Sequence, residues 1–125
     1  MTTAQKTIIV VEDDQDAAEM FEEMMRINGF RVLKASGCSQ AMTMINKEQP
    51  AAIILDIMMP DISGLEVLRC MRDDSKMVKI PVIVVSAKGL PNDIKVGLEA
   101  GSSVYLTKPV GYLDLKQALE KVLGA

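Results

Sequence analysis

Acidic side chains stand directly after two apolar runs of the sequence, where predicted strands end. Glu12 and Asp13 follow the first run, and Asp56 follows the third. Each acid alone has an ordinary explanation, as a residue of a turn or of a helix N-terminus. If the fold brings them together, however, their charges repel one another unless a cation offsets them. Oxygen ligands without histidine or cysteine indicate a hard cation, and Mg²⁺ that retains several waters fits best.

A hydroxyl and an ammonium group stand at two further strand ends. Ser86 follows the apolar run 80–85, and Lys108 comes shortly after the run 103–106. Alone, the serine would be an ordinary helix cap and the lysine a solvated side chain. Beside a metal site they are what phosphoryl transfer needs, because cations neutralise the transferred oxygens and the hydroxyl donates to one of them. The carboxylate of Asp56 is then a candidate nucleophile, which would give an aspartyl phosphate.

Five short strands are predicted to position these side chains. Their predicted ranges are 7–11, 31–35, 51–55, 80–85 and 103–106. The first, third and fourth are continuous apolar runs, and such runs are typical of parallel sheets covered on both faces.

Amphipathic helices are predicted after each strand. Asn28-Gly29 ends the first helix, Pro50 ends the second, and the segment 63–66 is a capping box that opens the third. The residues expected to face inward are Ala17, Met20, Phe21, Met24, Met25, Ala41, Met42, Ile45, Leu65, Leu68, Met71, Ile94, Gly97, Leu98, Leu115, Ala118, Leu119, Val122 and Leu123. This alternation predicts an open, doubly wound (βα)₅ α/β fold, in which ligands bind beyond the carboxyl ends of the strands.

Composition restricts the function classes. The chain has 125 residues, 49% of them hydrophobic, which suits one domain with one sizeable core. Its net charge of −3 argues against direct binding to nucleic acid or to an anionic membrane. There is no histidine, so the chain has no Ser/His or Cys/His nucleophile and cannot itself be a phosphohistidine donor.

The cysteines and the N-terminus indicate a cytoplasmic protein. Cys38 and Cys70 show no metal-type spacing and are expected to be buried or partly buried free thiols, as suits a reducing compartment. The N-terminal segment turns acidic after a short apolar run, so neither a signal peptide nor a membrane span is expected there.

Four segments together resemble the signature of bacterial and archaeal response-regulator receiver domains. They are VVEDD at 10–14, LDIMMPDISG at 55–64, VSA at 85–87 and YLTKP at 105–109. Each motif alone is weak, but they occur in the family's order and spacing across the whole chain. The resemblance implies one receiver domain over residues 1–125, with a flavodoxin-like five-stranded parallel sheet in the order 2-1-3-4-5.

The resemblance also implies roles for individual residues. Asp56 would be the phosphoacceptor, and Asp13 and Asp56 would ligate Mg²⁺ directly together with the backbone carbonyl of Met58. Glu12 would act on the metal's waters. Lys108 would pair with the phosphoryl oxygens, or with Asp56 before phosphorylation.

Further implied features concern the response to phosphorylation. Ser86 would be the switch hydroxyl, and Tyr105 would be the aromatic side chain whose rotamer follows it. The surface of the fourth helix, fifth strand and fifth helix would then change and be read by a partner. Lys108-Pro109 would be a cis bond, and Asp14, beyond the two acid positions, would cap the first helix.

The implied cofactor and partners follow from the same resemblance. The cofactor would be Mg²⁺, with Mn²⁺ able to substitute. The partners are implied as well. The phosphoryl donor would be a sensor histidine kinase or a histidine phosphotransfer protein. The partner that recognises the changed surface would be a downstream protein, or a C-terminal output domain if the sequence comes from a longer chain. We expect a monomer or weak dimer that binds neither nucleic acid nor membrane directly. It would be a signalling domain that assists its own phosphorylation and dephosphorylation, not an enzyme.

Three alternatives fit the sequence less well. A Mg²⁺-dependent phosphatase of the haloacid-dehalogenase type needs a second acid two residues after the first, where this chain has Met58. A flavodoxin-like cofactor binder needs a glycine- and hydroxyl-rich phosphate loop after the first strand, where this chain has acids that would repel a phosphate. A purely structural interaction domain has no need to concentrate acids, Ser86 and Lys108 at one edge.

Overall fold

A five-stranded parallel sheet forms the centre of the computed structural model, which describes residues 5–59 and 61–124. The strands are β1 (Thr7–Val11), β2 (Arg31–Ala35), β3 (Ala52–Asp56), β4 (Val82–Ser86) and β5 (Val104–Thr107). Their order is β2-β1-β3-β4-β5, which confirms the predicted fold. Pro60, part of the third-strand motif, lies outside the described residues.

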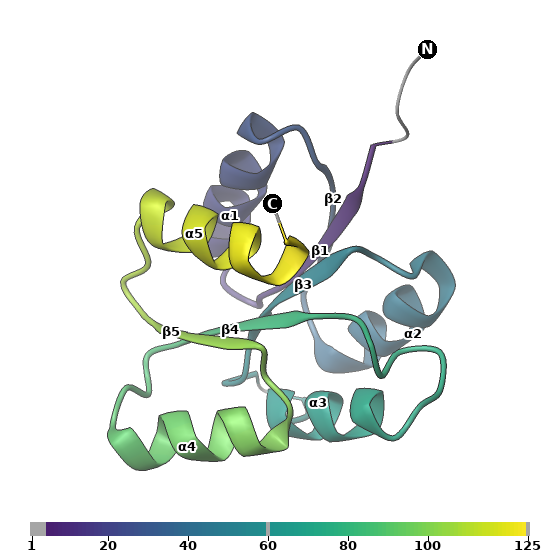
Figure 1. Ribbon diagram of the computed structural model, residues 1–125, viewed down its shortest axis with the longest axis vertical. Helices are drawn as coiled ribbons and strands as arrows, with labels where there is room; N and C mark the ends of the chain where they lie inside the picture. The colour runs from purple at the N-terminus through teal and green to yellow at the C-terminus, as the bar shows by residue number, and fades with distance from the viewer. Residues whose placement is uncertain (1–4, 60, 125) are drawn as a thin grey trace.

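Five helices cover the two faces of the sheet. They are α1 (Gln15–Ile27), α2 (Cys38–Glu48), α3 (Gly64–Arg72), α4 (Pro91–Ala100) and α5 (Tyr112–Leu123). Helices α1 and α5 lie on one face, and α2, α3 and α4 lie on the other (Figure 1). Among the described helices, none combines the length and hydrophobicity that crossing a bilayer requires.

The central strands β3 and β4 are buried along their whole length, which explains their uninterrupted apolar runs. Alternate side chains of each strand enter two separate cores. Leu55 packs on the side of α2 and α3, whereas Ile54 packs on the side of α1 and α5. The register sets Val11 beside Leu55 and Asp56 beside Val85. Residues that follow these strands therefore start from the same edge of the sheet.

Three predictions of burial were wrong. Met20 is 42% exposed, because α1 buries the neighbouring stripe that contains Phe21, about 100° further round the helix. Leu98 is 47% exposed, because Gly97 is the only buried residue of α4. Cys70 lies on the solvent side of α3 and is exposed, whereas the other thiol is buried as predicted.

The predicted helix caps are confirmed in part. Asp14 caps α1 by accepting hydrogen bonds from amides of its first turn. Ser63 caps α3, since its Oγ accepts a hydrogen bond from the Leu65 N–H at 3.2 Å. Glu66, predicted to complete a capping box there, instead forms an ion pair with Arg69.

The guanidinium of Arg72 organises the edge of the sheet opposite the acids. It donates two hydrogen bonds to the Gly101 carbonyl, at 2.7 and 3.0 Å. It also donates to the carbonyls of Val78 at 3.0 Å and Ile80 at 2.9 Å. One side chain thus joins the α3–β4 segment to the α4–β5 turn, and hydrogen bonds from a charged donor are stronger than neutral ones.

Arg72→Ala should lower the free energy of unfolding by about 2–3 kcal/mol, because several partly buried carbonyls lose a charged donor. Urea denaturation measures this change. Arg69→Ala is the matched control: it removes the same side chain from an exposed i,i+3 ion pair and should change stability by less than about 0.5 kcal/mol. Equal stability losses in the two variants would mean that the hydrogen bonds of Arg72 add no stability beyond that of an exposed ion pair.

Candidate functional site

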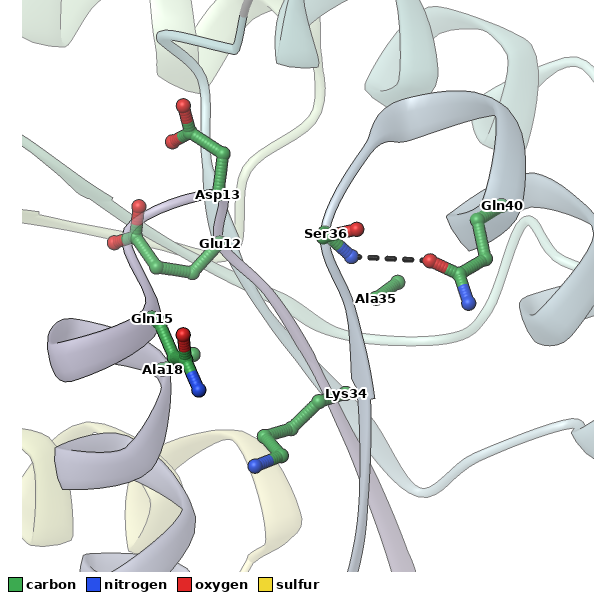
Figure 2. A pocket seen from close by; sticks show the side chains of 8 residues that line it. All are labelled: Glu12, Asp13, Gln15, Ala18, Lys34, Ala35, Ser36 and Gln40. Atoms are coloured by element: carbon green, nitrogen blue, oxygen red, sulfur yellow. Dashed lines mark hydrogen bonds between the residues drawn. The ribbon is translucent and has the colours of Figure 1, made fainter.

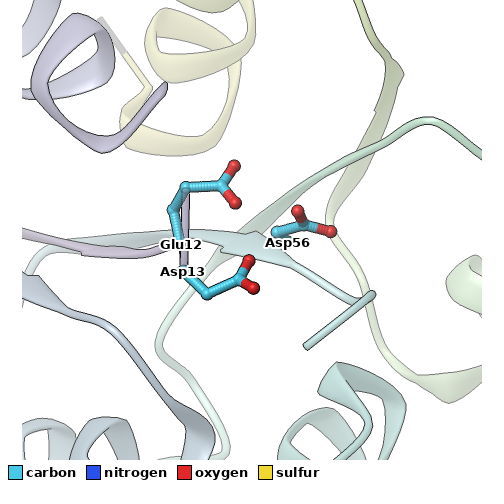
Figure 3. A group of neighbouring side chains, drawn as sticks. All are labelled: Glu12, Asp13 and Asp56. Atoms are coloured by element: carbon cyan, nitrogen blue, oxygen red, sulfur yellow. The ribbon is translucent and has the colours of Figure 1, made fainter. Parts of the chain in front are cut away.

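Three carboxylates meet at the carboxyl edge of the sheet. Glu12 and Asp13 follow β1, and Asp56 ends the neighbouring β3. One oxygen of each lies within 4.8 Å of the others (Figure 3). Glu12 and Asp56 are only 3% and 6% exposed, whereas Asp13 is exposed. Two acids of the cluster are therefore buried, and the third faces solvent.

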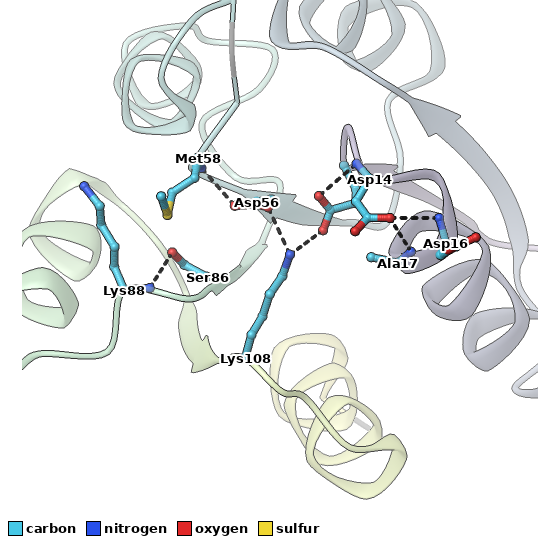
Figure 4. Close-up of polar contacts among 9 residues, drawn as sticks. Asp14, Asp16, Ala17, Asp56, Met58, Ser86, Lys88 and Lys108 are labelled. Atoms are coloured by element: carbon cyan, nitrogen blue, oxygen red, sulfur yellow. Dashed lines mark hydrogen bonds and ion pairs between the residues drawn. The ribbon is translucent and has the colours of Figure 1, made fainter.

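Lys108 supplies the compensating charge inside this cluster. Its Nζ lies 2.7 Å from Glu12 Oε1. It also lies 3.0 Å from Asp56 Oδ2, a contact that Figure 4 shows. A single ammonium cannot neutralise three carboxylates, so the ionised cluster keeps an excess of negative charge. The donor set, carboxylate oxygens with uncompensated charge and one solvent-facing member, fits a divalent hard cation such as Mg²⁺.

The pKa values reflect this crowding. Burial raises the pKa of Glu12 to about 7; the nearby Asp56 carboxylate adds to the rise, and the hydrogen bond from Lys108 opposes it. Burial alone would lower the pKa of Lys108, but its hydrogen bonds to Glu12 and Asp56 prevail and raise that pKa. Lys108 is therefore held as a cation, and the carboxylates at this edge gain from any further positive charge.

Both oxygens of Asp56 are held in place. Oδ1 accepts a hydrogen bond from the Met58 N–H at 2.8 Å, and Oδ2 contacts Lys108. Ser86 ends the adjacent strand β4 and is fully buried. Its Oγ accepts a hydrogen bond from the Lys88 N–H at 3.1 Å, which leaves its own proton available for donation.

Tyr105 is linked to this edge through the β4–α4 segment. Its hydroxyl donates a 2.6 Å hydrogen bond to the carbonyl of Lys88, whose N–H donates to Ser86. The ring packs closely against α4, since a Cβ added to Gly97 would lie 2.6 Å from it. One backbone residue therefore contacts both predicted switch side chains. The residue types gave no signal of this link, because Ser86 and Tyr105 both contact the main chain of Lys88 and not its side chain.

The acids are open to solvent on two sides. One opening is lined by Asp13, Met58 and Lys88, and Met58 is 50% exposed there. The second is a pocket of about 280 Å³ between α1, β2 and α2, where Glu12 and Asp13 share the walls with Lys34 (Figure 2). Both openings reach Asp13, so small ions can approach the acid cluster from solvent.

The residues predicted for the site lie together at this edge. Gathered around Asp56 are Glu12, Asp13, Met58, Ser86 and Lys108. The Lys108-Pro109 bond is cis, as the resemblance implied. Sequence reasoning missed the Glu12–Lys108 ion pair, which joins residues 96 apart and strand ends that are not neighbours in the sheet.

Comparisons with known sequences agree with this geometry. The sequence profile of the family described as "Response regulator receiver domain" matches residues 8–120. The phosphate regulon transcriptional regulatory protein PhoB of Pseudomonas aeruginosa is 36% identical over 94% of this chain and 52% of that protein. This chain thus spans about half the length of that relative. The polar-differentiation response regulator DivK of Brucella anthropi is 27% identical over 95% of this chain and 97% of that protein.

Solved structures share the fold. The receiver domain of sensor histidine kinase PA1611 from Pseudomonas aeruginosa, with a magnesium ion coordinated in its active site cleft, has a TM-score of 0.89. It is 29% identical, over 98% of this chain and 100% of that one. A CheY-like response regulator receiver domain protein from Methanospirillum hungatei also has a TM-score of 0.89, at 24% identity over 97% of this chain and 95% of that one. The chain therefore belongs to the family of response regulator receiver domains, the phosphoacceptor signalling switches of two-component systems.

Proposed function

We propose that Asp56 is the phosphoacceptor of this receiver domain and that Mg²⁺ bound beside it assists the transfer. The observation that carries this proposal is the position of the Asp56 carboxylate. It lies within the three-acid cluster, with one oxygen on the Lys108 ammonium and the other on the Met58 N–H. Asp56 also ends the strand next to the one that carries Ser86. A group attached to Asp56 could therefore be reached by both the ammonium and the hydroxyl.

Asp13, Asp56 and the backbone carbonyl of Met58 are the proposed Mg²⁺ ligands. The exposed Asp13 suits a metal that keeps part of its water shell. Glu12 is buried and paired with Lys108, so we assign it to the metal's waters instead of to the metal itself. Bound Mg²⁺ would neutralise charge on the phosphoryl oxygens during transfer, and Mn²⁺ could replace it.

The chain's own residues then perform the transfer. An Asp56 oxygen forms a bond to phosphorus while the bond from phosphorus to the donor's leaving group breaks, and the electron pair of that bond departs with the donor. Lys108 stabilises the charge on the transferred oxygens, and the Ser86 hydroxyl donates to one of them. As Ser86 moves towards the phosphoryl group, the Lys88 segment that it shares with Tyr105 is free to rearrange. Tyr105 and the α4–β5–α5 surface would report this change.

The partners belong to the same proposal. A sensor histidine kinase or a histidine phosphotransfer protein would donate the phosphoryl group, as the membership in the receiver-domain family suggests. The chain has no histidine, so it cannot itself carry a phosphohistidine. The relatives include a transcriptional regulator about twice as long and a response regulator of similar length. The partner that recognises the phosphorylated surface would accordingly be an output domain of the same chain or a separate protein. We also propose that residues 1–125 form one receiver domain, cytoplasmic and monomeric or weakly dimeric before phosphorylation.

Asp56→Asn should abolish labelling by acetyl phosphate in the presence of Mg²⁺, because an amide cannot serve as the acceptor. The parent chain should gain one phosphoryl group, as detected by intact-protein mass spectrometry. Asp14→Asn removes the same charge from an exposed α1 cap and should leave labelling intact. Undiminished labelling of Asp56→Asn would reject the assignment.

Asp13→Asn should weaken Mg²⁺ binding at least about tenfold, since losing even an indirect partner of a metal ligand usually weakens binding by that much. Isothermal titration calorimetry measures the affinity. Asp16→Asn, an exposed acid in the first turn of α1, controls for the change in net charge. Equal Mg²⁺ affinities for Asp13→Asn and the parent would remove Asp13 from the site.

Met58→Asn should shorten the lifetime of the phosphorylated protein by up to about tenfold. Met58 and Lys88 line one opening at this edge of the sheet, and both lie on the same side of Asp56 in Figure 4. The thioether of Met58 cannot orient an attacking water as an amide can, and a charged lysine only donates. One positioned hydrogen bond is worth roughly 1 kcal/mol, which sets the limit. Decay of the phosphorylated protein checks this; equal rates would mean that Met58 contributes only its backbone carbonyl.

A further inference from the structure

The β3–α3 loop, which carries Met58, is closed at its base. The Gly64 N–H donates a 3.1 Å hydrogen bond to the carbonyl of Ile57. The two segments approach so closely that a Cβ on Gly64 would lie 2.5 Å from the Ile57 Cα and 3.0 Å from the carbonyl oxygen of Asp56. The start and the end of the loop are therefore fixed against each other immediately after the proposed phosphoacceptor.

Asp61 holds the same loop at a second point, on the N-terminus of α2. Its Oδ1 accepts a hydrogen bond from the Cys38 N–H, and its Oδ2 accepts one from the Ser39 N–H, each at 3.2 Å. The N-cap position of α2 is occupied by Gly37, which has no side chain to cap the helix. The first amides of α2 are thus capped by a carboxylate from another part of the chain, in the orientation that the helix dipole favours.

Gly37 leaves the space that this contact needs. Its φ of −154° and ψ of 162° are extended values that any residue can adopt, so backbone conformation does not require glycine there. A Cβ at this position would lie 2.9 Å from Asp61 Oδ2, a distance that forces the carboxylate to move. The lack of a side chain at Gly37 and the bidentate cap by Asp61 are therefore parts of one arrangement.

Asp61 is not a fourth member of the acid cluster. It lines the same opening as Asp13 and Met58. Among the residues that the structure describes, however, the acids whose oxygens converge are Glu12, Asp13 and Asp56. Both oxygens of Asp61 are engaged by amides of α2. The backbone N–H groups of Ile62, Cys38 and Ser39 lower the pKa of Asp61, so it remains a carboxylate at neutral pH.

We infer that Asp61 is a positioning residue of the magnesium site, which sets the place of the Met58 carbonyl by fixing the β3–α3 loop to α2. The inference rests on the proposed function, in which that carbonyl is a metal ligand. Along the chain, Met58 lies between the closed base of the loop and the Asp61 anchor, so the segment that carries it is held on both sides. A ligand placed in advance loses less conformational entropy when the ion binds.

Calorimetric Mg²⁺ titrations of four variants test this inference. Asp61→Ala removes both acceptor oxygens and should weaken Mg²⁺ binding about tenfold. Gly37→Ala changes no charge but displaces the carboxylate, and should weaken binding in the same direction. Asp61→Asn keeps one acceptor oxygen and should stay within about threefold of the parent. Asp74→Ala removes an equal charge and a local turn hydrogen bond at the opposite edge of the sheet, and should bind like the parent.

A kinetic readout separates positioning from general destabilisation. In Asp61→Ala, the Mg²⁺ concentration that gives half-maximal phosphorylation by acetyl phosphate should rise about tenfold. The rate at saturating Mg²⁺ should return to within about twofold of the parent, because Asp56, Lys108 and Ser86 are untouched. Circular dichroism confirms folding. If Asp61→Ala does not fold, the comparison of Gly37→Ala with Asp61→Asn tests the inference, since only Gly37→Ala should bind Mg²⁺ more weakly.

Two results would overturn the inference while leaving the proposed function in place. The first is parent-like Mg²⁺ affinity in both Asp61→Ala and Gly37→Ala. The second is equal weakening in Asp61→Ala and Asp61→Asn with no change in Gly37→Ala, which would mean that only the charge of Asp61 matters. Failure of the parent chain to bind Mg²⁺ would reject the proposed function, and this inference with it.

Discussion

Two buried carboxylates on neighbouring strands, Glu12 after β1 and Asp56 in β3, impose the constraint on which the rest of the site depends. Their repulsion is only partly relieved by Lys108, which contacts both. A third acid, Asp13, adds to the negative charge from the solvent side. This edge of the sheet therefore keeps an excess of negative charge, which a divalent cation would offset. Phosphorylation of Asp56, as proposed, would alter contacts that already exist there.

The fold connects this local imbalance to other parts of the molecule. Parallel strands bring the ends of β1, β3, β4 and β5 to one edge, so an acid, a hydroxyl and an ammonium from distant parts of the chain lie at the same edge of the sheet. The Lys88 main chain connects Ser86 to Tyr105. At the opposite edge, Arg72 joins the loops that precede β4 and β5. The proposed site and the Arg72 hydrogen bonds thus lie at opposite edges of the sheet.

Much of this could be predicted from the sequence, because burial on both faces of a sheet leaves continuous apolar runs and the parallel topology decides where their ends meet. The strand ends and the cluster around Asp56 followed from that rule. The exposure of Met20 and Leu98 did not, since it depends on how far each helix rotates against the sheet. The Asp61 cap on α2 and the Lys88 link were also missed. They consist of contacts to backbone amides and carbonyls, which residue type does not encode.

A crystal structure of the chain with Mg²⁺ and beryllofluoride, a mimic of the phosphoryl group, would show whether Asp56 is the acceptor and which residues hold the metal. We expect beryllium bonded to an oxygen of Asp56 and Mg²⁺ ligated by Asp13, Asp56 and the Met58 carbonyl. Lys108 and Ser86 should contact the fluorides. Beryllofluoride on another carboxylate, or Mg²⁺ bound without Asp13 and Asp56, would reject the proposed site.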